Sequence, residues 1–88
     1  MKPSDYIRIG WTKGTLARDR NGINVGENDE DAVCWCIAGA CFKAMEVEKA
    51  WNALDRLRAH LNREVSLWND DPNRTQEEVI AALESVGL

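Results

Sequence analysis

The sequence predicts a mainly α-helical α+β domain, in which two to three further helices and one N-terminal β-hairpin pack around a buried central helix. Three observations predict this class. The stretch 32–45 has Lys43 as its only charge, in a chain of 88 residues that is 30% charged. A hairpin signal precedes this stretch, and segments with helical periodicity follow it. A chain of this length supports one hydrophobic core, so residues 1–88 form a single domain.

The N-terminal quarter predicts one short helical turn and then a β-hairpin. The turn begins near Pro3 and ends at Gly10. Over residues 11–25, two runs with β-forming residues flank Asn21-Gly22, and both of these residues tolerate the positive φ angles of a tight turn. A lone hairpin is marginally stable in water, so one face must pack against the helices. The expected contacts are Leu16, Ile23 and Val25.

Residues 31–45 predict the buried core helix, because a helix of this composition is apolar on nearly every side. The acidic run 26–31 before it would complement the positive end of the helix. Asn28 or Asp29 is the expected N-cap.

Small residues form a stripe along this predicted helix. At helical spacing, Ala32, Cys36, Gly39 and Lys43 fall on one line. Because Gly39 costs about 1 kcal/mol of helix propensity, some neighbour should benefit from the missing side chain. The stripe is either packed closely against the hairpin or another helix, or it forms the floor of a shallow ligand pocket. The wall of such a pocket would be Trp35 or Trp11.

Three further helical segments follow the central one. Residues 47–61 predict an amphipathic helix, residues 64–69 a short helical turn, and residues 76–86 a C-terminal helix that stops at Gly87. Thr75 and Glu78 have the spacing of a capping box at the start of the last helix. The expected apolar face of the amphipathic helix contains Val47, Ala50, Trp51, Leu54, Leu57 and Leu61.

The thiols and the single histidine predict neither a metal site nor a cofactor. Cys34, Cys36 and Cys41 cannot pair with one another within one regular helix, so we expect free, buried thiols in a reducing compartment. His60 falls on the polar face of its helix, far along the chain from the cysteines. No signal peptide is recognisable, and the central run is shorter than a membrane span. These observations favour a cytoplasmic protein.

The charges are distributed unevenly along the chain. The net charge of −4 disfavours a nucleic-acid partner, whereas residues 1–25 alone carry a net charge of +3 and the remainder carries −7. The basic residues near Trp11 could hold a small anionic, nucleotide-like ligand between the hairpin and the stripe of small residues. The ligand-binding residues of this hypothesis are Trp11, Lys13, Arg18, Trp35, Cys36 and Gly39.

Two other functions stay open. Four tryptophans exceed what one small core can cover, so a partly exposed Trp11 or Trp68 would indicate a protein adaptor or a self-associating module. The interaction surface of that hypothesis consists of Arg20, Trp68, Asn69, Asp70 and Arg74. A small hydrolase using Asp70, Asp71 and Arg74 is the least favoured alternative, because adjacent acids point apart and an Asx-rich loop explains them without chemistry.

Several motifs together resemble a family of short uncharacterised bacterial and bacteriophage proteins, a domain of unknown function. They are Gly-Trp-Thr-Lys-Gly-Thr-Leu-Ala-Arg-Asp at 10–19, Asn-Gly at 21–22, Cys-Trp-Cys-Ile-Ala-Gly-Ala at 34–40, Trp-Asn-Asp at 68–70 and Arg-Thr-Gln-Glu-Glu-Val at 74–79. The similarity covers nearly the whole chain and implies a cytosolic accessory protein. Taken together, the sequence favours a non-enzymatic binding protein whose partner is a small anion or another protein.

Overall fold

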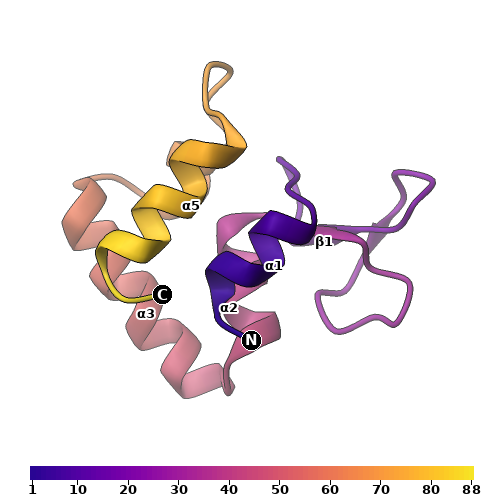
Figure 1. Ribbon diagram of the computed structural model, residues 1–88, viewed down its shortest axis with the longest axis horizontal. Coiled ribbons are helices and arrows are strands. Elements are labelled where there is room, and N and C mark those ends of the chain that lie inside the picture. The colour runs from indigo at the N-terminus through magenta and orange to yellow at the C-terminus, as the bar shows by residue number, and fades with distance from the viewer.

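The computed structural model describes residues 1–88 and contains five helices and a small three-stranded antiparallel sheet (Figure 1). The mainly α-helical class with a minor β component is therefore confirmed. In chain order the elements are α1 (Pro3–Ile9), β1 (Ala17–Arg18), β2 (Asn24–Val25), β3 (Cys34–Trp35), α2 (Ile37–Ala44), α3 (Val47–Leu61), α4 (Val65–Asn69) and α5 (Gln76–Ser85).

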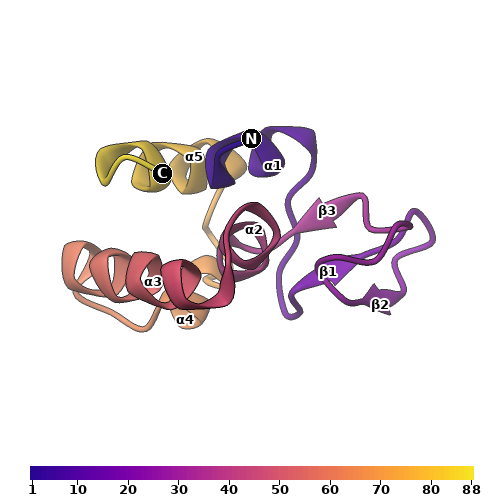
Figure 2. The ribbon, with the colours of Figure 1, turned by 90° about the horizontal axis from the view of Figure 1, so that it is seen from below.

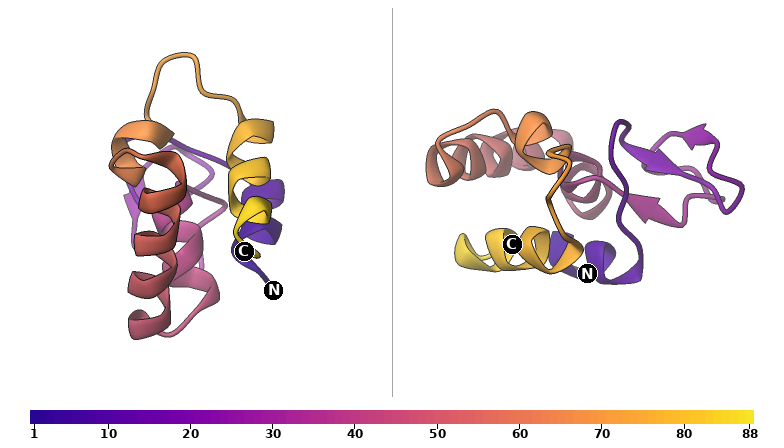
Figure 3. Two further views of the ribbon diagram at one scale, coloured as in Figure 1. Left: turned by 90° about the vertical axis from the view of Figure 1, so that its left-hand side faces the viewer. Right: turned by 90° about the horizontal axis from the view of Figure 1, so that it is seen from above.

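The helices form two layers with α2 between them (Figure 2). One layer contains α1 and α5, which pack against each other, and the other contains α3 and α4. The segment 70–75 crosses from one layer to the other (Figure 3), and the sheet lies at one end of the helical body. No helix combines the length and the apolar character that a membrane span requires. The largest fully buried apolar side chains are Ile7, Ile37, Leu57, Leu83, Val79 and Cys41.

The central helix is shorter than the sequence predicts. Residues 37–41 are buried on α2, as expected, but the predicted helix over 31–45 is wrong for its first six residues. Cys34 and Trp35 instead form β3, opposite Arg18 and Ala17 of β1. A short apolar run fits a buried strand as well as a helix, and pairing with β1 decides between them here.

Cys36 is the N-cap of α2, because its Sγ atom accepts a hydrogen bond from the backbone N–H of Gly39 over 3.3 Å. The predicted caps Asn28 and Asp29 are therefore wrong. Asp29 instead closes a turn between β2 and β3, where its Oδ1 atom accepts from the backbone N–H of Asp31. The acidic run is part of a loop and does not precede a helix.

A hairpin within 11–25 is confirmed, but its strands are only Ala17–Arg18 and Asn24–Val25, with Ala17 opposite Val25 in antiparallel pairing. The tight turn expected at Asn21-Gly22 is wrong, because Gly22 alone has a positive φ and the connection is a five-residue loop. The Asp19 carboxylate holds this loop by accepting hydrogen bonds from the backbone N–H groups of Asn21 and Ile23. Val25 packs against the core as predicted, and Ala17 is fully buried. The predicted core contact of Ile23 is wrong, because its side chain is 60% exposed.

The remaining helices agree with the sequence. A bend at Met45 and Glu46 separates α2 from α3, and Asn62 ends α3 in a left-handed conformation with φ of 54°. The capping box of Thr75 and Glu78 begins α5. After α5 the chain returns to α1, where the carbonyl oxygen of Leu88 accepts a hydrogen bond from the backbone N–H of Ser4.

Candidate functional site

Asn69 connects three segments that are distant in the sequence. This α4 side chain is fully buried, and its Oδ1 atom accepts hydrogen bonds from Trp11 Nε1 (2.8 Å) and from the backbone N–H of Ile37 (3.1 Å). Its Nδ2 group donates to the carbonyl oxygen of Thr12 (3.2 Å) and to Asp70 Oδ1 (2.9 Å). All four hydrogen-bonding positions of the amide are therefore used, as a buried amide requires.

Asp70 completes this connection, because its Oδ1 atom also accepts from the backbone N–H of Gly14 at 3.0 Å. The motif Trp-Asn-Asp at 68–70 thus holds the segment Gly-Trp-Thr-Lys-Gly at 10–14 through side-chain hydrogen bonds. Asn69 was predicted to be part of an interaction surface, and its complete burial contradicts this placement.

Arg18 holds the hairpin together. Its Nε atom donates to Thr12 Oγ1 at 3.0 Å, and one Nη group donates to the carbonyl oxygen of Lys13 at 3.1 Å. The other Nη group donates to the carbonyl oxygen of Gly22 and to Asn24 Oδ1. The guanidinium is consequently committed to partners within the protein.

Lys13 is engaged in a similar way. Its Nζ atom donates to the carbonyl oxygen of Asp71 at 2.7 Å and lies 5.2 Å from the ring centroid of Trp11. The structure therefore brings together three of the residues predicted to bind an anion, Trp11, Lys13 and Arg18, but their polar groups already have partners within the chain.

Gly39 is packed against the hairpin and does not face an open pocket. A Cβ atom at this position would collide with the carbonyl oxygen of Leu16, and that same oxygen accepts a hydrogen bond from the backbone N–H of Cys36. The close-packing interpretation of the small residues is confirmed at Gly39. Trp35, the predicted wall of the pocket, is 5% exposed and donates its Nε1–H to the carbonyl oxygen of Glu27.

The buried thiols are poorly suited to nucleophilic chemistry. Burial raises the pKa of Cys36, and burial together with the nearby Cys36 thiol raises the pKa of Cys41 to about 12. Both groups are therefore protonated near neutral pH, whereas a thiolate is the reactive form. No group of three or more histidine, cysteine or acidic side chains is arranged to hold a metal ion.

Hydrogen bonds to neighbouring residues hold the loop that contains Asp70, Asp71 and Arg74, the side chains of the hydrolase hypothesis. The backbone N–H of Asn73, followed by the side chain of Arg63, lowers the pKa of Asp71 through hydrogen bonding. Arg74 donates to the carbonyl oxygen of Trp68, and its guanidinium lies 3.8 Å from the centroid of that half-buried indole. A low pKa makes Asp71 a weak base, so this carboxylate does not resemble a general base.

The predicted interaction surface is thus only partly assembled. Trp68 and Arg74 are adjacent and partly exposed, as expected. Arg20 lies elsewhere, in the loop at the end of the hairpin, beside a shallow hollow that Glu30 and Asp31 also line.

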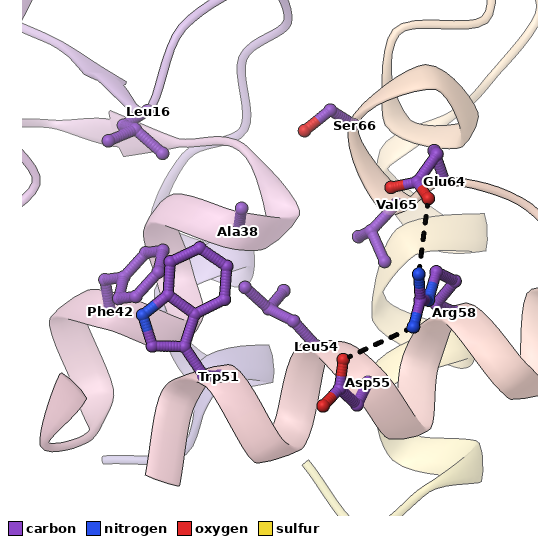
Figure 4. Close-up of a pocket in the computed structure, with 10 residues that line it drawn as sticks. All are labelled: Leu16, Ala38, Phe42, Trp51, Leu54, Asp55, Arg58, Glu64, Val65 and Ser66. Carbon is purple, nitrogen blue, oxygen red and sulfur yellow. Dashed lines mark ion pairs between the residues drawn. The ribbon is translucent and has the colours of Figure 1, made fainter. Parts of the chain in front are cut away.

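The largest hollow in the surface is a groove of about 500 Å³ between α2, α3 and α4 (Figure 4). We call it the α3 groove. Side chains from the hairpin, α2, α3 and α4 all point into it, so it exists only in the folded chain. Its apolar lining consists of Leu16, Ala38, Phe42, Trp51, Leu54 and Val65.

Trp51 is the most prominent side chain of the α3 groove. It is 57% exposed, and its ring lies edge-on to Phe42 with a centroid separation of 5.2 Å and an interplanar angle of 78°. The sequence placed Trp51 and Val47 on the buried face of their helix. Both placements are wrong, because Trp51 is 57% exposed and Val47 is 66% exposed. The side chains of α3 that are buried in the core are Ala50, Ala53 and Leu57.

Carboxylates line one side of the α3 groove. Arg58 lies between Asp55 and Glu64, at N–O distances of 3.6 and 3.5 Å (Figure 4). A smaller hollow of about 180 Å³ adjoins the groove, shares Leu16 and Ser66 with it, and also contains Asp70. The combined surface has an apolar floor, three carboxylates and one guanidinium.

The sequence did not predict this site, because the hairpin, α2, α3 and α4 form it together. One available signal was the width of the apolar face over 47–61, which exceeds what one neighbouring helix can cover. The other was the excess of tryptophan, which correctly predicted a partly exposed Trp11 or Trp68 but did not predict the exposure of Trp51.

Comparison with known proteins identifies a family. No curated protein and no solved structure matches the chain. A model of a family of unknown function, DUF6197, matches residues 4–87. Because this match spans almost the whole chain, the protein belongs to that family.

Proposed function

We propose that this protein is a non-enzymatic binding protein that holds apolar side chains of a protein partner in the α3 groove. The observation that carries the proposal is the position of Trp51, 57% exposed at the edge of a 500 Å³ groove with an apolar floor. Large apolar side chains exposed beside a hollow are typical of protein interfaces. Covering on the order of 100 Å² of indole surface would contribute about 2.5 kcal/mol.

The electrostatics of the site support a protein partner over a nucleotide-like anion. The acidic side chains Asp55, Glu64 and Asp70 outnumber the one basic side chain, Arg58, along the groove and its extension. An anion would therefore be repelled. On the hairpin, Arg18 and Lys13 would have to give up hydrogen bonds within the protein before they could bind a phosphate.

The chemistry of the remaining polar groups supports binding over catalysis. Cys36 and Cys41 are held as neutral thiols, and Asp71 is a weak base. A catalytic site needs a nucleophile and a base within reach of each other. Three free thiols further support the proposal that the protein acts in a reducing compartment such as the cytoplasm. An accessory role in bacteria or their phages stays a prediction.

Fluorescence of the uncharged dye Nile red tests this proposal directly. The dye emits more strongly, and at shorter wavelength, when it enters an apolar site, so adding the protein should produce a saturable increase in emission. The variant Ser66→Phe introduces a ring at the exposed rim of the α3 groove without altering a core side chain, and it should abolish the increase.

The matched control is Leu67→Phe, because Leu67 is the next residue of α4, is 61% exposed and does not line the groove. This variant should bind the dye like the original protein. Equal emission from the two variants, or no saturable increase with the original protein, would contradict the proposed function.

A further inference from the structure

We propose that the partner segment bound in the α3 groove is a basic amphipathic helix. This inference rests on the proposed function and specifies the chemistry of its partner. Two features of the described residues carry it, the spacing of the side chains along α3 and the sign of the charges beside them.

The α3 wall of the groove has a helical repeat. Trp51, Leu54, Asp55 and Arg58 line it at positions i, i+3, i+4 and i+7, and a helix rises about 10.5 Å over that interval. This length corresponds to about two helical turns, which is the interval over which a partner helix presents apolar anchors at the same spacing. A helix lying beside α3 could therefore place successive apolar side chains between Trp51 and the ion-paired end of the groove.

The charges beside the groove favour a basic partner. Asp55 and Glu64 flank Arg58, so this cluster of three side chains carries a net charge of −1 and favours a cationic partner over an anionic one. Asp70 lies in the adjoining hollow, and only one of its oxygens accepts hydrogen bonds within the protein. Lysine or arginine residues along the flank of a bound helix would meet these carboxylates, and complementary charges of this kind accelerate association.

The same charges disfavour a second copy of this chain as the occupant. Two copies facing each other through this surface would bring Asp55, Glu64 and Asp70 of both molecules together, and each copy has a net charge of −4. Like charges across an interface oppose association. A positively charged partner complements the acidic side chains of this surface, whereas a second copy of the chain does not.

Fluorescence anisotropy with labelled model peptides tests the inference. The probe is a peptide of about 18 residues, long enough to form a helix, with leucine at i, i+3, i+4 and i+7 and lysine elsewhere. One comparison peptide has the same composition in scrambled order, and a second has glutamate in place of every lysine. The basic helix should bind at least about tenfold more tightly than either comparison peptide.

Two pairs of variants locate the binding. Trp51→Ala should weaken binding of the basic helix by about tenfold or more, whereas Ile9→Ala, which removes a 60% exposed side chain from α1 in the other layer, should leave it unchanged. Glu64→Lys should weaken the basic helix and strengthen the acidic one. Glu30→Lys makes the same change of net charge in the loop before β3 and should have a much smaller effect. Thermal melts confirm that each variant is folded.

The dye and peptide experiments distinguish a failure of this inference from a failure of the proposed function. If Nile red binds but the basic helix neither binds nor displaces it, the helical partner is wrong and the groove remains a binding site. Equal binding of all three peptides, or preference for the acidic one, would also overturn the inference. A dimer in sedimentation that dissociates on Trp51→Ala would show that a second copy occupies the groove, and this too would overturn it.

Discussion

Asn69 is the side chain on which the relative positions of the hairpin, α2 and α4 depend most. Its four hydrogen bonds join Trp11 and Thr12 in the segment before β1, the first residue of α2, and Asp70. The sequence did not predict this role, because the partners lie up to 58 residues away and no local pattern encodes them. The capping box at Thr75 was predictable for the opposite reason, since its partner is three residues away.

Asn69→Ala should therefore destabilise the protein by about 2–3 kcal/mol, because it leaves the partly buried indole N–H of Trp11 and the buried backbone N–H of Ile37 without acceptors. Urea unfolding followed by circular dichroism measures the change. Asn73→Ala is the matched control, since this exposed residue uses only its backbone N–H in the loop, and its stability should stay close to that of the original protein. Similar losses for the two variants would disprove the role assigned to Asn69.

The raised pKa of Cys41 predicts that the protein loses stability at alkaline pH. Its pKa is raised by burial, and then by the nearby Cys36 thiol, to about 12 in the folded protein, against 9.0 for an unperturbed thiol. Because the folded-state pKa is the higher one, the stabilisation is complete below pH 9 and is lost as the pH rises towards 12. This group alone should lower the free energy of unfolding by about 1.4 kcal/mol for each pH unit in that window.

Urea unfolding at several pH values between 9 and 11 measures that slope. Cys41→Ala should be less stable than the original protein at pH 7, because it leaves a cavity, but its stability should fall less steeply above pH 9. The other side chains that titrate above pH 9 are present in both proteins and contribute equally to the two slopes. Parallel curves for the two proteins would show that Cys41 titrates normally in the folded state.

At the scale of secondary-structure elements, the contact between the hairpin and α2 determines where the central helix begins. β3 takes Cys34 and Trp35 into the sheet, and Cys36 then caps the helix that the sequence had extended back to residue 31. The three helices α3, α4 and α5 were predictable because each has its own apolar periodicity or cap. The boundary at residue 36 was not, because an apolar run has no periodicity that separates strand from helix.

Gly39→Ala tests the closeness of that contact. Alanine is the better helix former by about 1 kcal/mol, but its Cβ atom would collide with the backbone carbonyl of Leu16, which cannot move as a flexible side chain could. The substitution should therefore destabilise the protein, by about 1–3 kcal/mol. Gly26→Ala has no atom within 4 Å of the added Cβ and should be nearly neutral. A more stable Gly39→Ala variant in thermal melts would mean that α2 and the hairpin are not in contact there.

At the scale of the whole molecule, the two-layer arrangement leaves α3 only half covered. α3 contacts α2, α4 and α5, whereas its side chains Trp51 and Leu54 border the α3 groove. Sequence periodicity gives the width of an apolar face but not the number of neighbours that cover it. The fold class and most helices could therefore be predicted, and the groove, which needs the hairpin, α2, α3 and α4 together, could not.

The most direct test of the binding proposal uses the four indole N–H resonances in a ¹H–¹⁵N NMR spectrum, recorded while the neutral aromatic probe benzyl alcohol is added. Trp11 and Trp35 donate their indole N–H groups to partners within the protein, so their resonances serve as internal controls. We expect a saturable shift of the Trp51 resonance and little change in those of Trp11 and Trp35. A stationary Trp51 resonance, or equal shifts of all four, would contradict binding in the α3 groove.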